Sequence, residues 1–262
     1  MIVALLTDFG TRDHYVASLL GTILSIARDV TIVDITHDIE PQNVDEAAYT
    51  LGCCYLDFPK GTIFLAVVDP GVGSERRPVA LRTGGRYFVG PDNGLFGFLL
   101  GEPFEAFEIA DPAYTSARRS ATFHGRDVFA PAAAHLANGV EISSLGPQLT
   151  DLRILTDHNP RADRDRTFGT VVHVDRFGNL ITDLTVSDLA GGFVIRINGR
   201  EVSNLRRFYD EEAGGEPFAI IGSTGRVEIS VNRGSAARVL DVRAGLRFEL
   251  RKTTPPGPAA ST

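Results

Sequence analysis

The chain has 262 residues, with 26 Lys or Arg against 33 Asp or Glu, so its formal net charge is −7. This acidic balance argues against a non-specific nucleic-acid-binding protein, because such proteins need excess positive charge to displace counterions from phosphates. Hydrophobic residues make up 43% and charged residues 23% of the chain, which is typical of a soluble globular protein of one large domain or two modest ones. The longest apolar runs, such as residues 63–68, are far too short to span a bilayer.

The cysteines and the first residues bear on the cellular setting. Only two cysteines occur, and Cys53 and Cys54 are neighbours, which excludes a disulfide framework. The chain starts with the apolar run Ile2–Leu6 without a basic leader and reaches Asp8 at once, so we expect no signal peptide. Both observations predict a reducing, cytoplasmic location.

The first 150 residues alternate short apolar runs with apolar residues at helical spacing. The runs Ile2–Leu6, Val30–Ile35 and Thr62–Val68 are typical of buried strands. Two apolar stripes between them predict helices, the first of them capped by Asp13. This order predicts a mostly parallel sheet flanked by helices. A hairpin follows, turning at Gly84-Gly85, and a further helix is expected over about 130–138.

In the second half the hydrophobic period becomes two. Segments 194–202, 218–221, 227–231 and 246–250 alternate or pair as short strands, the first turning at Asn198-Gly199. This pattern predicts a smaller all-β barrel domain.

These changes in pattern set the expected domain boundaries. We expect an N-terminal α/β domain over residues 1–150, a linker over 151–167 and a C-terminal β-barrel domain over 168–252. Residues 253–262, rich in Pro, Ala and Gly, are expected to be disordered.

Acidic residues follow two of the predicted parallel strands. Asp8 comes after the first strand and Asp69 after the third. Ligands of open parallel sheets bind outside the carboxyl ends of the strands, so we expect both carboxylates on one rim. The alternative for Asp8 is that it only caps the following helix.

His124 stands in a polar segment before the third predicted helix. Its imidazole has an unperturbed pKa of about 6.5 and is suited to acid–base chemistry, the alternative being a structural or merely exposed histidine. The six histidines form no i, i+4 pair and no cluster with cysteine, which argues against zinc. Aspartates are plentiful, so a Mg²⁺ site stays open.

The polar turns 175–179 and 222–225 suit a small zwitterionic ligand, the alternative being ordinary β-turns.

Six short segments together carry a family resemblance. They are Thr-Asp-Phe-Gly-Thr at 7–11, Val-Val-Asp-Pro-Gly-Val-Gly at 67–73 with Arg76-Arg77, Gly-Pro-Asp-Asn-Gly at 90–94, His-Gly-Arg-Asp-Val-Phe-Ala-Pro at 124–131, Phe-Gly-Asn at 177–179 and the Ser223 turn. In this order they resemble the adenosine-forming S-adenosyl-L-methionine (SAM) hydrolases, also called SAM hydroxide adenosyltransferases, which are related to the fluorinases and chlorinases. The resemblance runs from Ile2 to about Leu250. It implies an α/β domain, a β-barrel domain, and a homotrimer with active sites at subunit interfaces.

The resemblance also implies roles for individual residues of the first domain. Asp8 matches the acid that holds the ribose diol, and a carboxylate accepting from two hydroxyls forms charge-assisted hydrogen bonds. Asp69, Arg76 and His124 match the water-activating catalytic set, Asp69 also counting among the substrate-binding residues.

In the second domain the matched positions concern the two ends of the substrate. Asn179 and Ser223 match residues facing the methionine part, and Glu228 and Val231 match residues near the adenine. Asp175 is a candidate partner of the substrate ammonium, although the spacing before Phe-Gly-Asn differs between hydrolases and halogenases.

The implied reaction is the hydrolysis of SAM to adenosine and L-methionine by in-line attack of an activated water or hydroxide on ribose C5′. Arg76 and a protonated His124 stabilise hydroxide, or neutral His124 takes the proton as a base; the sequence leaves both roles open. The implied reaction requires no metal and no organic cofactor, and SAM is the only small-molecule partner expected, with no nucleic acid and no membrane.

Three alternative functions differ in class. A halogenase would use halide as nucleophile, and the charge of Asp69 argues against it, because unit charges ~4 Å apart interact by about 4 kcal/mol at an intermediate dielectric. The short turn at 82–86 also leaves no room for the extra loop of the halogenases. A non-catalytic adenosine- or SAM-binding module would not need Asp69, Arg76 and His124 together. A metal-dependent hydrolase of another nucleoside would lose activity in EDTA.

Overall fold

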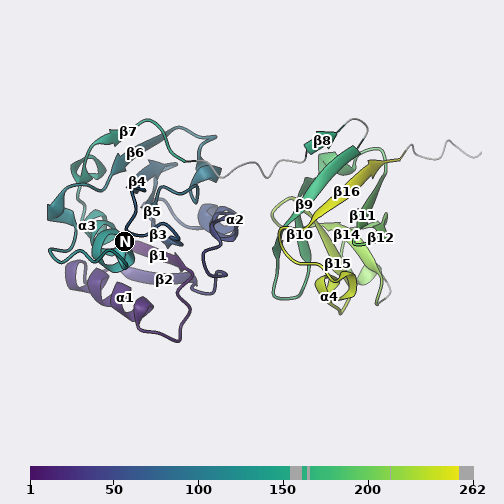
Figure 1. Ribbon diagram of the computed structural model, residues 1–262, viewed down its shortest axis with the longest axis horizontal. Helices are drawn as coiled ribbons and strands as arrows, with labels where there is room; N and C mark the ends of the chain where they lie inside the picture. The colour runs from purple at the N-terminus through teal and green to yellow at the C-terminus, as the bar shows by residue number, and fades with distance from the viewer. Residues whose placement is uncertain (154–160, 164–165, 213, 254–262) are drawn as a thin grey trace, which may run out of the picture. The chain divides into compact units, whose positions relative to one another are not determined.

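The computed structural model describes residues 1–153, 161–163, 166–212 and 214–253 (Figure 1). The chain divides into two compact units, Met1–Leu155 and Thr156–Thr262. Most of the predicted linker over 151–167 and all but the first residue of the predicted tail over 253–262 lie outside the described residues, so the expected domain limits stay predictions. In the described part of the chain, no helix has the length and apolar character needed to cross a membrane.

The first unit is built on a seven-stranded sheet with the strand order β2-β1-β3-β5-β4-β6-β7. Its strands are β1 (Ile2–Thr7), β2 (Thr31–Thr36), β3 (Ile63–Val67), β4 (Pro78–Thr83), β5 (Arg86–Pro91), β6 (Phe104–Glu108) and β7 (Gln148–Leu149). The first four in this order run parallel, and β4, β6 and β7 pair antiparallel. The predicted α/β class with a mostly parallel sheet is confirmed, and β6 and β7 are additions that the sequence pattern did not indicate.

The sheet of the first unit is covered on both faces because successive side chains of a strand point to opposite sides. Val3 and Leu5 of β1 belong to one apolar cluster with residues of α1 (Tyr15–Ile26) and α3 (Ala130–Ala137). Ala4 and Leu6 belong to another cluster with residues of α2 (Val44–Cys54). Figure 1 shows α2 on one side of these strands and α1 and α3 on the other.

Two helix starts differ from the simplest expectation. Helix α1 has His14 rather than Asp13 at its N-cap, and no side chain caps it. Helix α3 is preceded by one wide π-turn over Gly125–Phe129, in which the backbone N–H of Ala130 donates to the Gly125 carbonyl. Such π-turns add a residue to a helical path and often lie at functional sites.

The second unit is a β half-barrel, which confirms the predicted smaller all-β barrel domain. Its strands follow the order β12-β11-β16-β9-β10-β15-β14-β13, with β8 paired to β9. They are β8 (Arg161–Asp163), β9 (Arg166–Val174), β10 (Leu180–Thr185), β11 (Phe193–Ile197), β12 (Arg200–Val202), β13 (Leu205–Arg206), β14 (Pro217–Ile221), β15 (Arg226–Val231) and β16 (Arg247–Lys252), with one short helix, α4 (Ala236–Leu240). The predicted Asn-Gly turn joins β11 to β12, with φ of 44° at Asn198 and 76° at Gly199.

Candidate active site

A cavity of about 570 Å³ lies in the first unit, where β1 and β3 end. Thr7 pairs with Val67 in the parallel register of these strands, so the segments that follow them start side by side. The residues that line the cavity are Asp8, Phe9, His14, Tyr15, Gln42, Val67, Asp69, Pro70, Val72, Ser120, Thr122, Phe123, His124, Gly125 and Arg126. The structure thus brings Asp8, Asp69 and His124, far apart in the sequence, into one cavity.

Glycine is needed where the loop after β3 approaches the segment before His124. Gly73 has φ of +78°, and a Cβ atom there would lie 2.3 Å from the backbone oxygen of Ala121. Only glycine tolerates both the positive φ and the close approach. This contact brings the loop that carries Asp69 against the segment that leads to His124.

Arg76 links Asp69 to His124 through hydrogen bonds. Its Nε donates to Asp69 Oδ1 at 2.8 Å, and its Nη2 donates to Asp69 Oδ2. The same Nη2 lies 2.8 Å from His124 Nδ1. All three side chains are buried, and the Arg76 guanidinium lies over the Phe129 ring, 5.1 Å from its centroid. Both carboxylate oxygens of Asp69 therefore accept hydrogen bonds from one guanidinium.

The protonation of His124 follows from its partner. A guanidinium only donates, so His124 Nδ1 must accept and its neutral ring carries the proton on Nε2. Burial is the main cause that lowers the pKa of His124 from its ordinary value, and the positive charges of Arg76 and Arg119 lower it further, against Asp69 and Asp127. His124 is therefore a neutral Nε2–H donor at the cavity.

The Asp8 carboxylate, which follows β1, is held by the backbone of another loop. Its Oδ2 accepts the backbone N–H of Gln42 at 2.8 Å, and the loop after it is tied to the end of β2 because Gly10 N donates to the His37 carbonyl at 2.7 Å. Burial raises the pKa of the Asp8 carboxyl, the Gln42 N–H opposes this rise, and the charge of Asp69 adds to it. Asp8 is not the cap of helix α1, whose N-cap is His14 without a side-chain hydrogen bond, and it lines the cavity.

An aromatic cluster lines the same cavity. The ring centroids of Phe9, Tyr15 and Phe123 lie 5.2–5.9 Å apart. The Arg126 guanidinium lies over the Phe123 ring at 4.9 Å. The sequence patterns gave no role to any of these four side chains, although Phe9 stands in the segment 7–11 and Arg126 in the segment 124–131.

The predicted residues of the second unit lie on two turns, 175–179 and 222–225, and on the strand β15. Asp175 Oδ1 accepts the N–H groups of Phe177 and Asn179, and its Oδ2 accepts Asn179 Nδ2, each at 2.8–2.9 Å. Asp175 and Asn179 thus form one closed turn, and Phe177 on that turn is 76% exposed. Ser223 lies exposed in the β14–β15 turn.

Glu228 and Val231 lie on β15 and are buried. The Tyr209 hydroxyl donates to Glu228 Oε2 at 3.2 Å. Burial raises the pKa of the Glu228 carboxyl, the Tyr209 hydroxyl opposes this rise, and the charge of Asp175 adds to it. Val231 packs in the core, so a contact of this residue with a ligand would use its backbone.

Across the residues that the structure describes, no group of three or more His, Cys, Asp or Glu side chains is arranged to hold a metal ion.

Comparison with known proteins decides the family. The SAM hydroxide adenosyltransferase N-terminal domain matches residues 3–146, and the C-terminal domain of the same family matches residues 169–249. The chain belongs to this family. The resemblance carried by the six sequence segments is therefore confirmed.

Relatives in this family match over nearly the whole chain. The (R)-S-adenosyl-L-methionine hydrolase of Thermus thermophilus is 43% identical, over 95% of this chain and 98% of its own length. The hydrolase of the same name from Salinispora arenicola is 36% identical, over 93% and 95%. The fluorinase of Actinopolyspora mzabensis is 28% identical, over 96% and 97%.

A solved structure agrees with the fold. The crystal structure of an uncharacterized conserved protein from Thermotoga maritima has a TM-score of 0.87 and 35% identity, covering 96% of this chain and all of that one. The crystal structure of a conserved hypothetical protein from Thermus thermophilus gives a TM-score of 0.77 at 40% identity, with 96% and 99% coverage.

The hydrogen bond from Arg76 predicts the tautomer of His124 in solution. We expect ¹⁵N NMR of the ring to show a neutral Nε2–H imidazole at pH 7, with a pKa below the ordinary value of about 6.5. The His124→Ala variant assigns the resonance. A protonated Nδ1 at pH 7, or a pKa above 6.5, would contradict the donor role of Arg76.

Proposed function

We propose that this protein hydrolyses SAM to adenosine and L-methionine. The observation that carries the proposal is the hydrogen-bonded set of Asp69, Arg76 and His124 at a cavity that also holds Asp8, in a chain whose relatives over nearly full length are (R)-S-adenosyl-L-methionine hydrolases. We also propose roles for the residues of this site.

The chemistry of SAM places the demand on the nucleophile. Its sulfur is a sulfonium, so methionine leaves as a neutral thioether and needs no general acid. Water or hydroxide attacks C5′ in line with the C5′–S bond, and the new C–O bond forms as the C–S bond breaks. When water is the nucleophile, its proton passes to solvent water. Holding the oxygen behind C5′ is therefore the main task of the protein.

The geometry argues against both roles that the sequence left open for His124, the protonated stabiliser of hydroxide and the neutral base, and favours a third. Its Nδ1 accepts from Arg76, and its lowered pKa keeps the ring neutral, so His124 is neither an imidazolium nor a base with a free nitrogen. Asp69 is paired through both of its oxygens with Arg76, so its place in the set is to hold the guanidinium against His124. His124 Nε2–H acts as a donor that holds the attacking oxygen and stabilises its hydroxide character.

Asp8 is suited to bind the ribose. One of its oxygens accepts from Gln42 N, which fixes the direction of the carboxylate at the cavity. Two vicinal hydroxyls donating to a carboxylate form strong hydrogen bonds, and these favour the charged form of a group whose pKa burial has raised. With the diol held, C5′ is placed relative to His124.

The second unit and the assembly are also part of the proposal. Asn179 and Ser223, with Asp175, contact the methionine part, and Glu228 and Val231 lie near the adenine. As in the family that the sequence resembles, three chains of 28.3 kDa form a homotrimer in which one subunit completes the site of its neighbour. Sedimentation velocity measures this mass directly, and a monomer at working concentration would contradict the assembly.

The structure changes the argument against the halogenase alternative. The expected repulsion between Asp69 and a halide is weaker than its formal charge suggests, because the Arg76 guanidinium pairs with both oxygens. The turn between β4 and β5 holds only Gly84 and Gly85, which leaves the extra halogenase loop without a place. The hydrolase relatives are also more similar than the fluorinase.

The product of the reaction tests the function. Incubated with SAM in ¹⁸O-water, the protein should release adenosine that carries the label on its 5′ oxygen, with and without excess chloride and EDTA. A 5′-chloro nucleoside in chloride would support the halogenase instead. Loss of turnover in EDTA would support the metal-dependent alternative, and binding without turnover would support the binding module.

Two variants separate binding from chemistry. Asp8→Asn should raise KM for SAM about tenfold, because a charge-assisted contact to the diol is lost. His124→Ala should lower kcat by about 10²-fold or more, as for the loss of a donor to a developing oxyanion, with KM little changed. An unchanged KM in the first variant, or an unchanged kcat in the second, removes that residue from its proposed role.

A further inference from the structure

Asp127 is a buried carboxylate close to the active site to which neither the sequence patterns nor the resemblance gave a role. It lies three residues after His124, inside the π-turn Gly125–Phe129, and its side chain is 3% exposed. A charged group is rarely buried unless it is paired and hydrogen-bonded. The contacts of Asp127 therefore indicate what it holds.

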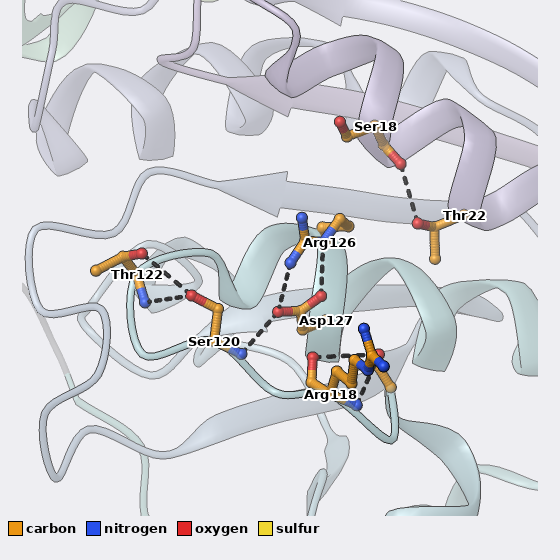
Figure 2. Close-up of polar contacts among 8 residues, drawn as sticks. Ser18, Thr22, Arg118, Ser120, Thr122, Arg126 and Asp127 are labelled. Carbon is orange, nitrogen blue, oxygen red and sulfur yellow. Dashed lines mark hydrogen bonds and ion pairs between the residues drawn. The ribbon is translucent and has the colours of Figure 1, made fainter.

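The side chain of Asp127 joins two pieces of the cavity wall. Its Oδ2 accepts the backbone N–H of Ser120 at 2.8 Å. Arg126 Nε donates to its Oδ1 at 2.7 Å, and Arg126 Nη2 donates to its Oδ2 at 3.0 Å. Figure 2 shows the carboxylate between Arg126 and the backbone of Ser120. Ser120 and Arg126 both line the cavity.

The backbone of Asp127 extends the same connection. Its N–H donates to the Phe123 carbonyl at 3.1 Å, and its carbonyl accepts Ser116 N at 2.7 Å. Within this segment, Ser120 Oγ accepts a hydrogen bond from the Thr122 N–H and forms another with the Thr122 hydroxyl (Figure 2). Asp127 therefore ties residues 116–123 to the turn that begins immediately after His124.

The charge of Asp127 also acts on His124. The charged groups around that imidazole are Arg76 and Arg119, which lower its pKa, and Asp69 and Asp127, which raise it. Hydrogen bonds from Arg126 and Ser120 keep the pKa of the Asp127 carboxyl low despite burial, so it is ionised at neutral pH. Asp127 is therefore, with Asp69, one of the two carboxylates whose charge favours the protonated form of His124.

We propose that Asp127 is a positioning residue for the hydrolysis: through Ser120 and Arg126 it holds the cavity wall against the turn that carries His124, and so fixes where the His124 Nε2–H meets the attacking oxygen. This inference rests on the proposed function. A displacement of about 1 Å in a catalytic group can cost about 10²-fold in rate, so such a hold is expected to affect kcat more than substrate binding.

The test is the Asp127→Asn variant of the full chain, with the pH profile of kcat as the decisive readout. An amide keeps the size but cannot accept from Ser120 N and both Arg126 nitrogens at once. We expect kcat to fall at least tenfold and KM to change less than threefold. The acid limb of the profile, where His124 becomes protonated, should move to lower pH because a nearby negative charge is gone.

Asp111→Asn is the matched control. Asp111 is an exposed aspartate of the same unit that also accepts a backbone N–H, that of Ala113 at 2.9 Å, and it does not line the cavity. The kcat and the pH profile of the Asp111→Asn variant should equal those of the wild type. An Asp127→Asn variant with wild-type kcat overturns the proposal. So does one whose kcat falls while its acid limb stays in place, because that pattern shows a structural role only.

Two further measurements keep these outcomes distinct. If circular dichroism shows that Asp127→Asn does not fold, Arg126→Gln is used instead, because it keeps the contact between Asp127 and Ser120 and removes only the guanidinium. This variant should have a lower kcat and a KM that is little changed. A wild-type kcat in this variant would overturn the proposal. Turnover of SAM by the wild type is measured first, so failure of the proposed function is seen there. In that case the His124 pKa is followed by NMR, where a decrease in Asp127→Asn supports the coupling and an unchanged pKa refutes it.

Discussion

The Arg76 guanidinium determines the character of the candidate active site, because one group that never gives up its proton contacts both an acid and an imidazole. Its bidentate contact pairs both oxygens of Asp69 with one guanidinium, and its third hydrogen bond fixes the tautomer of His124. Burial strengthens these contacts, since little water competes for them. The cavity is thus provided with a neutral N–H donor rather than a base, and such a donor can hold and stabilise an attacking oxygen. The leaving thioether departs uncharged and needs no general acid.

The first unit supplies the framework for this set through its parallel strands. The register of β1 against β3 places the segments after Thr7 and Val67 next to each other, and these segments bear Asp8 and Asp69. Apolar clusters on both faces of the sheet leave its carboxyl edge as the place for polar groups. The two carboxylates therefore lie side by side because β1 and β3 run in the same direction. They lie at the edge of the sheet because the side chains of β1 alternate between two apolar faces.

The sequence predicted the parts of this arrangement that depend on local pattern. Buried strands, the two-fold period of the second unit and the Asn198-Gly199 turn are encoded within a few residues, and the strand ends indicated Asp8 and Asp69. The pairing of Arg76 with His124 joins residues 48 positions apart, so spacing alone could not assign the imidazole its tautomer. The cap of α1 was expected at Asp13 but lies at His14. The π-turn before α3 was also missed, because its apolar residues fit an α-helix equally well.

That π-turn makes the site depend on the number of residues as well as on their identity. An α-helical path closes its backbone hydrogen bonds after four residues, whereas the bond from Ala130 to Gly125 spans five. Loss of a single residue from this turn, after Asp127, would rotate every side chain that precedes the deletion by about 100° relative to α3. The Asp127 carboxylate would then face away from Ser120. All residues from 124 to 130 are buried except the half-buried Arg126, so there is no free position at which an inserted or deleted residue could be absorbed. The length of the His124–Ala130 stretch is itself a constraint on variation.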